Sequence, residues 1–343
     1  MKKLLNTLYV TSEDAFLALD GENIVVRFAD DTEKAIPLHL LSSVVSFSYK
    51  GAPPALMGKC VQSGVAMAFY TPQGRFLCQV GNETAGNVYL RREQYRRADD
   101  AAQSLAIARN FIAGKLYNAK FVLLRCARDH ALQADAEKLR GAAASLHESL
   151  SACLSAQSDD QLRGVEGSAA SAYFQVFDEM VLREKQAFAF RGRSRRPPLD
   201  RTNALLSFAY SLLTSDCAAA LRGVGLDPYV GFMHVDRPGR KSLALDLVEE
   251  LRPVCADRFV LTLINNRVLS PGDFVVQESG AVLLTDEARR TFLSEWQKRK
   301  RETLTHPYLD EKIEWGLVPH VQALLLARYV RGDLDQYPPF FWK

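Results

Sequence analysis

Several features that define common protein classes are missing from this sequence. Its six cysteines, at positions 60, 78, 126, 153, 217 and 255, include no Cys-x-x-Cys spacing, which argues against zinc fingers and a disulfide framework. A Gly-x-x-x-x-Gly-Lys-Ser/Thr loop for nucleotide triphosphates is also missing. No apolar run approaches the length of a membrane span, and polar residues after Met1–Leu5 interrupt a signal-peptide core. We therefore expect a cytoplasmic protein.

A large excess of one charge is missing as well. The chain has 43 basic and 40 acidic side chains and a net charge of +3. Any affinity for nucleic acid must therefore come from local basic patches rather than from the overall charge. With 343 residues, the chain is long enough for two domains, each with its own core.

Two kinds of periodicity divide the chain. Short runs rich in β-branched and aromatic residues, with a hairpin signal at Asp20–Asn23, predict strands at 4–10, 15–20, 23–28, 35–37, 41–47, 65–70 and 76–80, and a short helix at 53–63. After a polar linker at 81–87, helical spacing predicts helices at about 105–131, 136–154, 169–184, 203–221, 242–252, 254–264, 286–303 and 317–331. Pro253 is expected to end the helix before it. The predicted class is α+β, with a small β-rich domain at 1–85 and a larger all-α domain at 86–343.

The segment Gly231–Pro253 carries candidate metal ligands. His234 precedes a polar turn, and the predicted helix after the turn carries Asp246, Glu249 and Glu250. Asp246 and Glu249 are three residues apart and share one helix face, whereas the two adjacent glutamates diverge. An imidazole with carboxylates favours Mg²⁺ or Mn²⁺, and the neighbouring arginines suggest a phosphate substrate. Taken alone, a solvated acidic face with an ordinary histidine is the commoner explanation.

A second segment, Arg163–Ala170, strengthens the metal hypothesis. Glu166 lies between two glycines near the start of an apolar-periodic run, with Ser158 or Asp160 as a plausible helix cap. The helix dipole accounts for an acidic residue in a first turn. It does not account for the glycines, which cost helix stability. They make sense if another backbone or a phosphodiester approaches closely.

Together these motifs resemble a known family. The patterns R-G-x-E-G-x-x-A-x-x-Y-F at 163–174 and G-F-x-H-x-x-x-P-G-R-x-S-L-A-L-D-L-x-E-E-x-R-P at 231–253, with the block 198–210, are similar to the CRISPR-associated integrase. That family is the metal-dependent DNA endonuclease that inserts new spacers during CRISPR adaptation, and the resemblance covers nearly the whole chain. Segments 191–196 and 337–342 resemble its type I-C branch.

The resemblance implies a site and a chemistry. Its metal ligands fall on Glu166, His234 and Glu249, and Asp246 matches a further acidic position; many relatives have aspartate where this chain has Glu249. The implied cofactor is Mg²⁺ or Mn²⁺, and all four residues are candidate catalytic residues. The implied reaction is attack of a DNA 3′-hydroxyl on a phosphodiester of the CRISPR repeat.

The resemblance also implies partners. These are double-stranded DNA, as prespacer and CRISPR repeat, a second copy of the chain bound through residues 1–85, and the small second CRISPR adaptation protein, which completes a heterohexamer. A loop with four arginines, flanked by glycine and proline, suggests a polyanion nearby. The candidate DNA-binding residues are Arg193, Arg195, Arg196, Arg237, Arg240 and Lys241.

Two alternatives remain open at this point. A stand-alone metal-dependent nuclease of branched or damaged DNA predicts hydrolytic products without a partner. A non-catalytic DNA-binding subunit predicts binding that depends neither on metal nor on Glu166.

Overall fold

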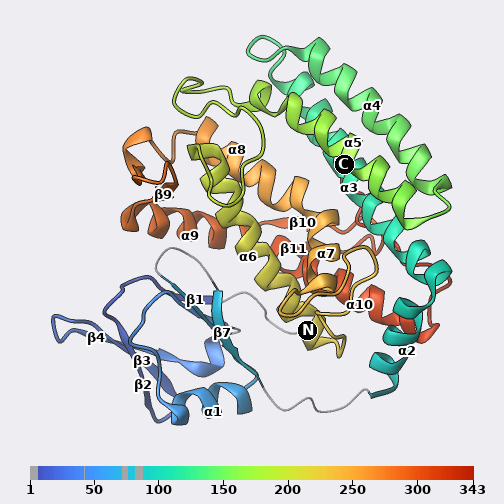
Figure 1. Ribbon diagram of the computed structural model, residues 1–343. Coiled ribbons are helices and arrows are strands. Elements are labelled where there is room, and N and C mark those ends of the chain that lie inside the picture. The colour runs from blue at the N-terminus through green and yellow to red at the C-terminus, as the bar shows by residue number, and fades with distance from the viewer. Residues whose placement is uncertain (1–6, 42, 72–75, 82–87) are drawn as a thin grey trace. The chain divides into compact units, whose positions relative to one another are not determined.

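The computed structural model describes residues 7–41, 43–71, 76–81 and 88–343, and the chain divides into two compact units (Figure 1). One unit consists of residues 1–86, 273–275 and 283–302, and the other of 87–272, 276–282 and 303–343. A β-rich N-terminal part is followed by a mainly helical part, which confirms the predicted α+β class. The division into a dimerisation domain of residues 1–85 and a catalytic domain of residues 86–343 stays a prediction.

The described residues of the first unit form two sheets. Strands β2 (Phe16–Asp20), β3 (Asn23–Arg27) and β4 (Glu33–Pro37) form an antiparallel meander. The predicted hairpin turn is present, because Asp20 pairs with Asn23 and Gly21 has a φ of +55°. The other sheet has the order β1 (Thr7–Val10), β5 (Ser43–Ser46), β6 (Ala66–Tyr70) and β7 (Phe76–Val80).

Helix α1 (Pro54–Gln62) joins the parallel strands β5 and β6, and Leu56 and Cys60 on its inner face are buried in a core with Val44 and Met67. Helix α9 (Asp286–Arg301) belongs to the same unit. Residues 1–6 and 72–75, and all but Gly81 of the predicted linker, lie outside the described residues.

The second unit is built from helices. They are α2 (Val88–Asp99), α3 (Ala101–Asp129), α4 (Ala136–Ser155), α5 (Asp159–Gln175), α6 (Arg201–Gly223), α7 (Ser242–Arg252), α8 (Arg258–Asn265) and α10 (Val318–Arg331). The long helix α3 packs against α4, α5 and α7, and α7 also packs against α6. Side-chain caps begin several of them: Asp100 accepts from two N–H groups of α3, and Asp200 accepts from Asn203 N of α6.

Short elements complete the chain. Two small hairpins pair β8 (Phe274–Val276) with β9 (Val282–Leu284) and β10 (Thr303–Thr305) with β11 (Lys312–Glu314). Single 3₁₀ turns occupy Leu38–Leu40, Phe177–Met180, Pro271–Asp273 and Trp315–Leu317. These two hairpins and helix α2 were not predicted from the sequence.

The helix that carries Glu166 differs from its prediction. The chain was expected to be helical from 169 to 184, whereas α5 begins at Asp159 and ends at Gln175. Ser158 caps it through Gln161 N, as proposed. Glu166 therefore lies in the middle of the helix, and the explanation by a first-turn dipole is wrong for it. The cap and the buried Leu162 and Ala169 offset the cost of two internal glycines.

Pro253 does not end α7, contrary to prediction. The backbone stays helical at Pro253, with φ −62° and ψ −38°, and continues through a π-helical turn (Pro253–Asp257) into α8. Proline lacks an N–H and its ring crowds the preceding turn. The wider π turn accommodates both defects, and such turns are frequent at functional sites.

Helix α6 meets the length and composition expected of a membrane span, which the sequence analysis overlooked. Of its apolar 18-residue window, 61% is buried inside the protein, as is common for a core helix. By itself this helix is weak evidence for a membrane span.

Candidate active site

Side chains from three helices meet at the site, where two of the predicted ligands lie against the ammonium group of a lysine. Glu166 projects from α5, Glu249 from α7 and Lys115 from α3. The ammonium group of Lys115 contacts the carboxylate of Glu166 and lies 2.6 Å from Oε2 of Glu249. The structure therefore places both predicted acidic ligands around a single positive charge.

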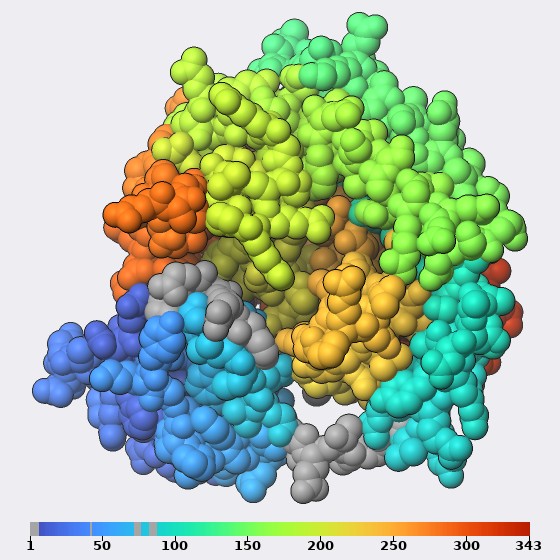
Figure 2. Space-filling model, viewed as in Figure 1, coloured from blue at the N-terminus to red at the C-terminus, as the bar shows by residue number. Residues whose placement is uncertain are grey.

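The third predicted ligand lies in the loop between α6 and α7. Arg163 on α5 donates to the carbonyl oxygen of Met233 at 2.7 Å, so the loop and α5 are neighbours. Figure 2 shows this face, with the segment around 166 in lime green beside the segment 233–241 in gold. His234 is also close enough to Glu249 to help lower the pKa of that carboxyl.

Asp246 holds the His234 loop against α7. Its side chain is fully buried, and its Oδ1 lies 2.7 Å from Nδ1 of His234 and accepts the backbone N–H of the same residue at 2.9 Å. Its Oδ2 accepts the N–H groups of Phe232 (2.7 Å) and Met233 (3.1 Å). An ionised carboxylate only accepts hydrogen bonds, so Nδ1 donates to Asp246, and in the neutral ring Nε2 keeps its lone pair for a ligand.

The approach of the loop to α7 requires glycine at 231. A Cβ at Gly231 would lie 2.8 Å from Cβ of Ser242 and 2.9 Å from Oδ2 of Asp246, closer than real Cβ atoms come. The predicted polar turn follows, with Arg240 N bonded to Arg237 O at 2.9 Å and Gly239 at φ +75°. The turn was predicted from the sequence, whereas the steric reason for Gly231 is visible only in the structure.

Glu249 is held as an anion. Burial raises its pKa, but Arg252, Lys115 and His234 outweigh that effect and keep the pKa at about 2. Arg252, itself buried, lies 3.2 Å from Oε1 of Glu249. Oε2 is buried and has no hydrogen-bond partner of proper geometry within the described chain, although the Lys115 ammonium is close to it.

A buried aromatic cluster positions Arg252. Its guanidinium lies over the rings of Phe174 and Tyr210, at 5.8 and 5.6 Å from their centroids. Asp257, at the end of the π turn, accepts from Tyr210 Oη at 2.5 Å and from Tyr173 Oη at 3.0 Å. Burial raises the pKa of Asp257, and Arg252 counteracts the rise. Tyr173, in the motif at 163–174, is buried. Arg252 and Asp257 were not predicted as site residues from the sequence.

The adjacent glutamates diverge, as predicted. Glu250 is fully buried and accepts three hydrogen bonds, from Tyr337 Oη (2.8 Å), Gln322 Nε2 (2.6 Å) and Phe340 N (2.7 Å). Burial raises its pKa to about 8. Gly114 on α3 leaves the space for it, because a Cβ there would lie 2.7 Å from Cγ of Glu250. Glu250 therefore anchors the C-terminal tail rather than facing Lys115.

Lys115 and Asn118 are the site residues of α3 that the sequence analysis missed. Asn118 Nδ2 donates to the carbonyl oxygens of Glu250 (2.9 Å) and Phe340 (2.8 Å). A signal was available, because both polar residues interrupt the apolar periodicity of a buried helix, next to Gly114. Buried charges are normally paired.

The donor atoms are of the types that bind a divalent metal, and Lys115 lies between two of them. Two carboxylates and a neutral imidazole nitrogen suit Mg²⁺ or Mn²⁺, and the carboxylate of Glu249 is held as an anion. Within the described ranges, no three His, Cys, Asp or Glu side chains are close enough together to hold a metal ion. Lys115 provides the positive charge between the two carboxylates.

The candidate DNA-binding residues differ in their surroundings. Arg195, Arg196 and Arg237 are exposed, and Arg240 is half-buried. Burial, with a contribution from Arg222, lowers the pKa of Lys241 to about 8.

Arg193 instead makes contacts with residues of the same unit. It bonds to Asn203 Oδ1 (2.6 Å) and Ser207 Oγ (3.1 Å) and lies over the ring of Tyr210. Contacts within the chain therefore hold this arginine without a polyanion.

Both glycines around Glu166 are exposed. A Cβ at Gly164 or Gly167 would meet no atom within 4 Å. Within the described residues, no other backbone of this chain approaches them, so that explanation for the glycines is wrong. The phosphodiester explanation stays a prediction.

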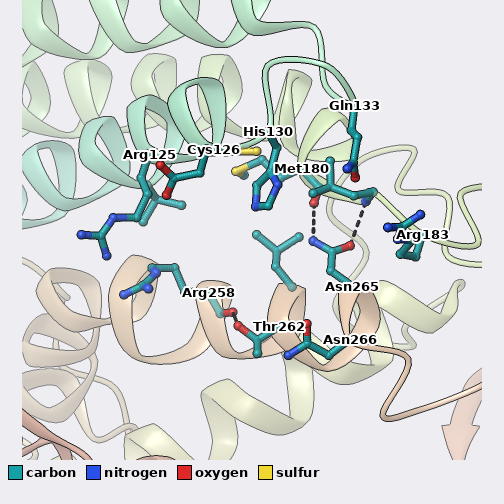
Figure 3. A pocket seen from close by; sticks show the side chains of 14 residues that line it. Arg125, Cys126, His130, Gln133, Met180, Arg183, Arg258, Thr262, Asn265 and Asn266 are labelled. Carbon is teal, nitrogen blue, oxygen red and sulfur yellow. Dashed lines mark hydrogen bonds between the residues drawn. The ribbon is translucent and has the colours of Figure 1, made fainter.

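A cavity of about 360 Å³ lies elsewhere in the same unit, between α3 and α8 (Figure 3). Its lining includes Arg125, His130, Arg258 and Asn265, and Asn265 bonds to Met180 O and Leu182 N. None of the predicted metal ligands lines it, so the candidate chemistry lies outside this cavity.

Comparison with known proteins establishes the class. The family model "CRISPR associated protein Cas1" matches residues 8–298. The chain is 48% identical over 343 residues to "CRISPR-associated endonuclease Cas1 1" of Chlorobaculum tepidum and 52% identical over 347 residues to "CRISPR-associated endonuclease Cas1 2" of Rhodospirillum rubrum, covering all of each chain. The chain therefore belongs to the Cas1 family. It is an endonuclease of CRISPR systems.

Solved structures share the fold. A CAS1 protein from Thermotoga maritima has a TM-score of 0.83 at 22% identity, with 97% of this chain and 99% of that chain covered. A casposase bound to integration product has a TM-score of 0.84 at 23% identity, with 98% and 93% covered. In a Cas6-RT-Cas1–Cas2 complex the TM-score is 0.81 at 22% identity, with 100% of this chain and 36% of that chain covered.

Proposed function

We propose that this endonuclease is a metal-dependent integrase that inserts short foreign DNA fragments as new spacers into a CRISPR array. The observation that carries the proposal is the position of two acidic side chains. Glu166 and Glu249 both lie against the buried Lys115 ammonium, close to His234. The histidine is oriented with Nδ1 on Asp246, so that Nε2 is available as a ligand.

Glu166, His234 and Glu249 would hold Mg²⁺ or Mn²⁺. Such an ion supplies charge neutralisation at the phosphate and a more acidic attacking hydroxyl. The chain contributes the preorganisation: Asp246 fixes the imidazole, and Arg252 keeps Glu249 ionised. The glutamate at 249 brings its carboxylate to the same lysine ammonium as Glu166.

The proposed reaction is a transesterification. The 3′-oxygen of the incoming DNA forms a new bond to a phosphorus of the CRISPR repeat, and the bond from that phosphorus to its original 3′-oxygen breaks. The same site acting with water is an endonuclease, which agrees with the names of the relatives. The integration product bound to the casposase, a protein of the same fold, supports the joining reaction.

The substrates and partners follow from the same proposal. Double-stranded DNA, as prespacer and repeat, would contact the exposed Arg195, Arg196 and Arg237, with Arg240 and Lys241 beside them, and binding should weaken steeply with salt. Arg193 would act through Tyr210 and Asn203 rather than as a free phosphate ligand. In the cytoplasm, a homodimer joined through residues 1–85 would assemble with the small second adaptation protein into a heterohexamer. The Cas6-RT-Cas1–Cas2 complex supports that partner. Type I-C membership stays a prediction.

A strand-transfer assay tests the proposal. A supercoiled plasmid carrying a CRISPR repeat is incubated with short duplex DNA ending in 3′-hydroxyls, with the small partner protein, and with Mn²⁺, Mg²⁺ or EDTA. We expect covalent joining by the wild type only with metal, and none with Glu166→Ala or His234→Ala. The matched controls are Glu148→Ala and His147→Ala, the same substitutions on the exposed face of α4, which should join DNA at the wild-type rate.

The other outcomes separate the alternatives. Metal-dependent cutting without joining, even with the partner present, would favour a stand-alone nuclease. DNA binding with neither reaction would leave a binding subunit, an outcome that the endonuclease relatives already disfavour.

A further inference from the structure

Lys115 occupies an unusual position for a lysine. Its side chain is only 5% exposed, and it projects from α3 toward carboxylates that belong to two other helices. Its ammonium group contacts Glu166 and lies 2.6 Å from Glu249 Oε2. These are the two acidic residues that are proposed above as metal ligands.

The charges around Lys115 are balanced without a metal. Glu166 and Glu249 carry two negative charges, and Lys115 and Arg252 carry two positive charges. Two carboxylates this close repel each other unless a cation lies between them. A divalent ion added to this set would meet a full positive charge at the carboxylates that it needs, in a partly buried setting where charge interactions are strong.

Packing between α3 and α7 does not depend on the Lys115 charge. Gly114 allows Glu250 to lie against α3, and Asn118 bonds to the carbonyl oxygen of Glu250. The contacts at Gly114 and Asn118 therefore join the two helices without Lys115. The ammonium group is directed to the metal-ligand carboxylates.

We propose that Lys115 is a resident counter-ion that holds the carboxylates of Glu166 and Glu249 together in the metal-free enzyme and competes with the divalent metal for them. It is a positioning residue, and it sets how tightly the metal binds. This inference rests on the proposed metal site. It predicts that removal of the charge makes metal binding tighter while it makes the metal-free protein less stable.

The test is the substitution Lys115→Met, which keeps the length of the side chain and removes its charge. Mn²⁺ alone is titrated into the protein and followed by electron paramagnetic resonance, and thermal unfolding is recorded in EDTA and in saturating Mn²⁺. We expect the Kd for Mn²⁺ to fall by about tenfold or more. We also expect a lower melting temperature in EDTA and a larger gain on adding Mn²⁺ than in the wild type.

A purely structural lysine gives a different pattern. Its removal would lower the melting temperature equally in EDTA and in Mn²⁺. The Kd for Mn²⁺ would stay the same or rise, and that result would overturn the inference. Lys120→Met is the matched control, because Lys120 lies on the same helix over Tyr117 and Phe121, and its loss should not change the Kd. Lys115→Gln, neutral but polar, replaces Lys115→Met if the Lys115→Met protein does not fold.

Glu166→Ala separates this inference from the function on which it rests. If the wild type binds Mn²⁺ and Glu166→Ala does not, the metal site stands, and the Lys115 variants alone decide the inference. If Mn²⁺ binding is missing in the wild type, or is unaffected by Glu166→Ala, the proposed metal site fails and the inference fails with it.

Discussion

The substitution Asp246→Asn probes the orientation of His234. Each oxygen of Asp246 accepts two hydrogen bonds, Oδ1 from the backbone and ring of His234 and Oδ2 from Phe232 N and Met233 N. In asparagine one oxygen becomes an NH₂ group, so two of the four donors lose their acceptor. The arrangement that leaves fewer orphan donors places the NH₂ group against the histidine, since imidazole can exchange its proton between nitrogens and a backbone amide cannot.

The expected magnitudes follow from that geometry. The remaining unpaired N–H group of His234 and the lost charge-assisted bond together cost about 2 to 4 kcal/mol of unfolding free energy. The reversed tautomer puts the proton on Nε2, where a metal would bind, and we expect Mn²⁺ affinity to fall by about 10- to 100-fold. Urea unfolding in EDTA and a Mn²⁺ titration measure the two effects separately.

Asp236→Asn is the matched control. Asp236 is exposed, lies in the same loop, and accepts only a long bond of 3.3 Å from Gly231 N among the described contacts. Its substitution should change the unfolding free energy by less than about 0.5 kcal/mol and leave metal affinity unchanged. If Asp246→Asn binds Mn²⁺ as tightly as the wild type, the proposed orientation of His234 by Asp246 is refuted.

Three further predictions follow from the packing around α7. Gly231→Ala places a Cβ 2.8 Å from Cβ of Ser242, and we expect a loss of about 1 to 3 kcal/mol in urea unfolding; an unchanged midpoint would contradict the close approach. The pKa of Glu249 is about 2, below its ordinary 4.5, so its contribution to stability is complete above pH 4.5 and is lost as the pH falls toward 2. The stability difference between the wild type and Glu249→Gln should therefore shrink by about 2 kcal/mol from pH 7 to pH 3, and a constant difference would refute the ion-pair assignment. Tyr337→Phe removes a hydrogen bond to the buried Glu250 and should cost about 1 to 3 kcal/mol, whereas Tyr308→Phe, an exposed tyrosine, should cost almost nothing.

Local rules predicted most elements and several details of this fold. Runs of β-branched and aromatic residues and the Asp20–Asn23 signal predicted the strands of the first unit, and neighbouring residues alone determine a hairpin turn. Ser158 caps α5 for the same local reason. The divergence of Glu249 and Glu250 also follows from helix geometry without tertiary contacts.

Local rules failed where packing outweighed them. Pro253 stops a helix in isolation, but here the buried segment 253–257 continues the helix through a π turn that ends at Asp257. Two glycines weaken a helix, yet α5 runs through both, since its cap and buried face stabilise it. The four arginines of the loop at 191–196 suggested a polyanion nearby. Arg193 is instead held by a hydrogen bond to Asn203 and by contact with the ring of Tyr210.

The sequence by itself determined the family, through motifs that carry Glu166, His234 and Glu249, and it determined which side chains have metal-binding chemistry. Only the tertiary structure decided that Lys115 lies against two of those carboxylates and that Arg252 and Asp257 support them. Lys115 and Glu166 are 51 positions apart, whereas sequence periodicity relates only residues within a turn or two of one element. Contacts between separate helices depend on how α3, α5 and α7 pack, and that packing is set by the whole core.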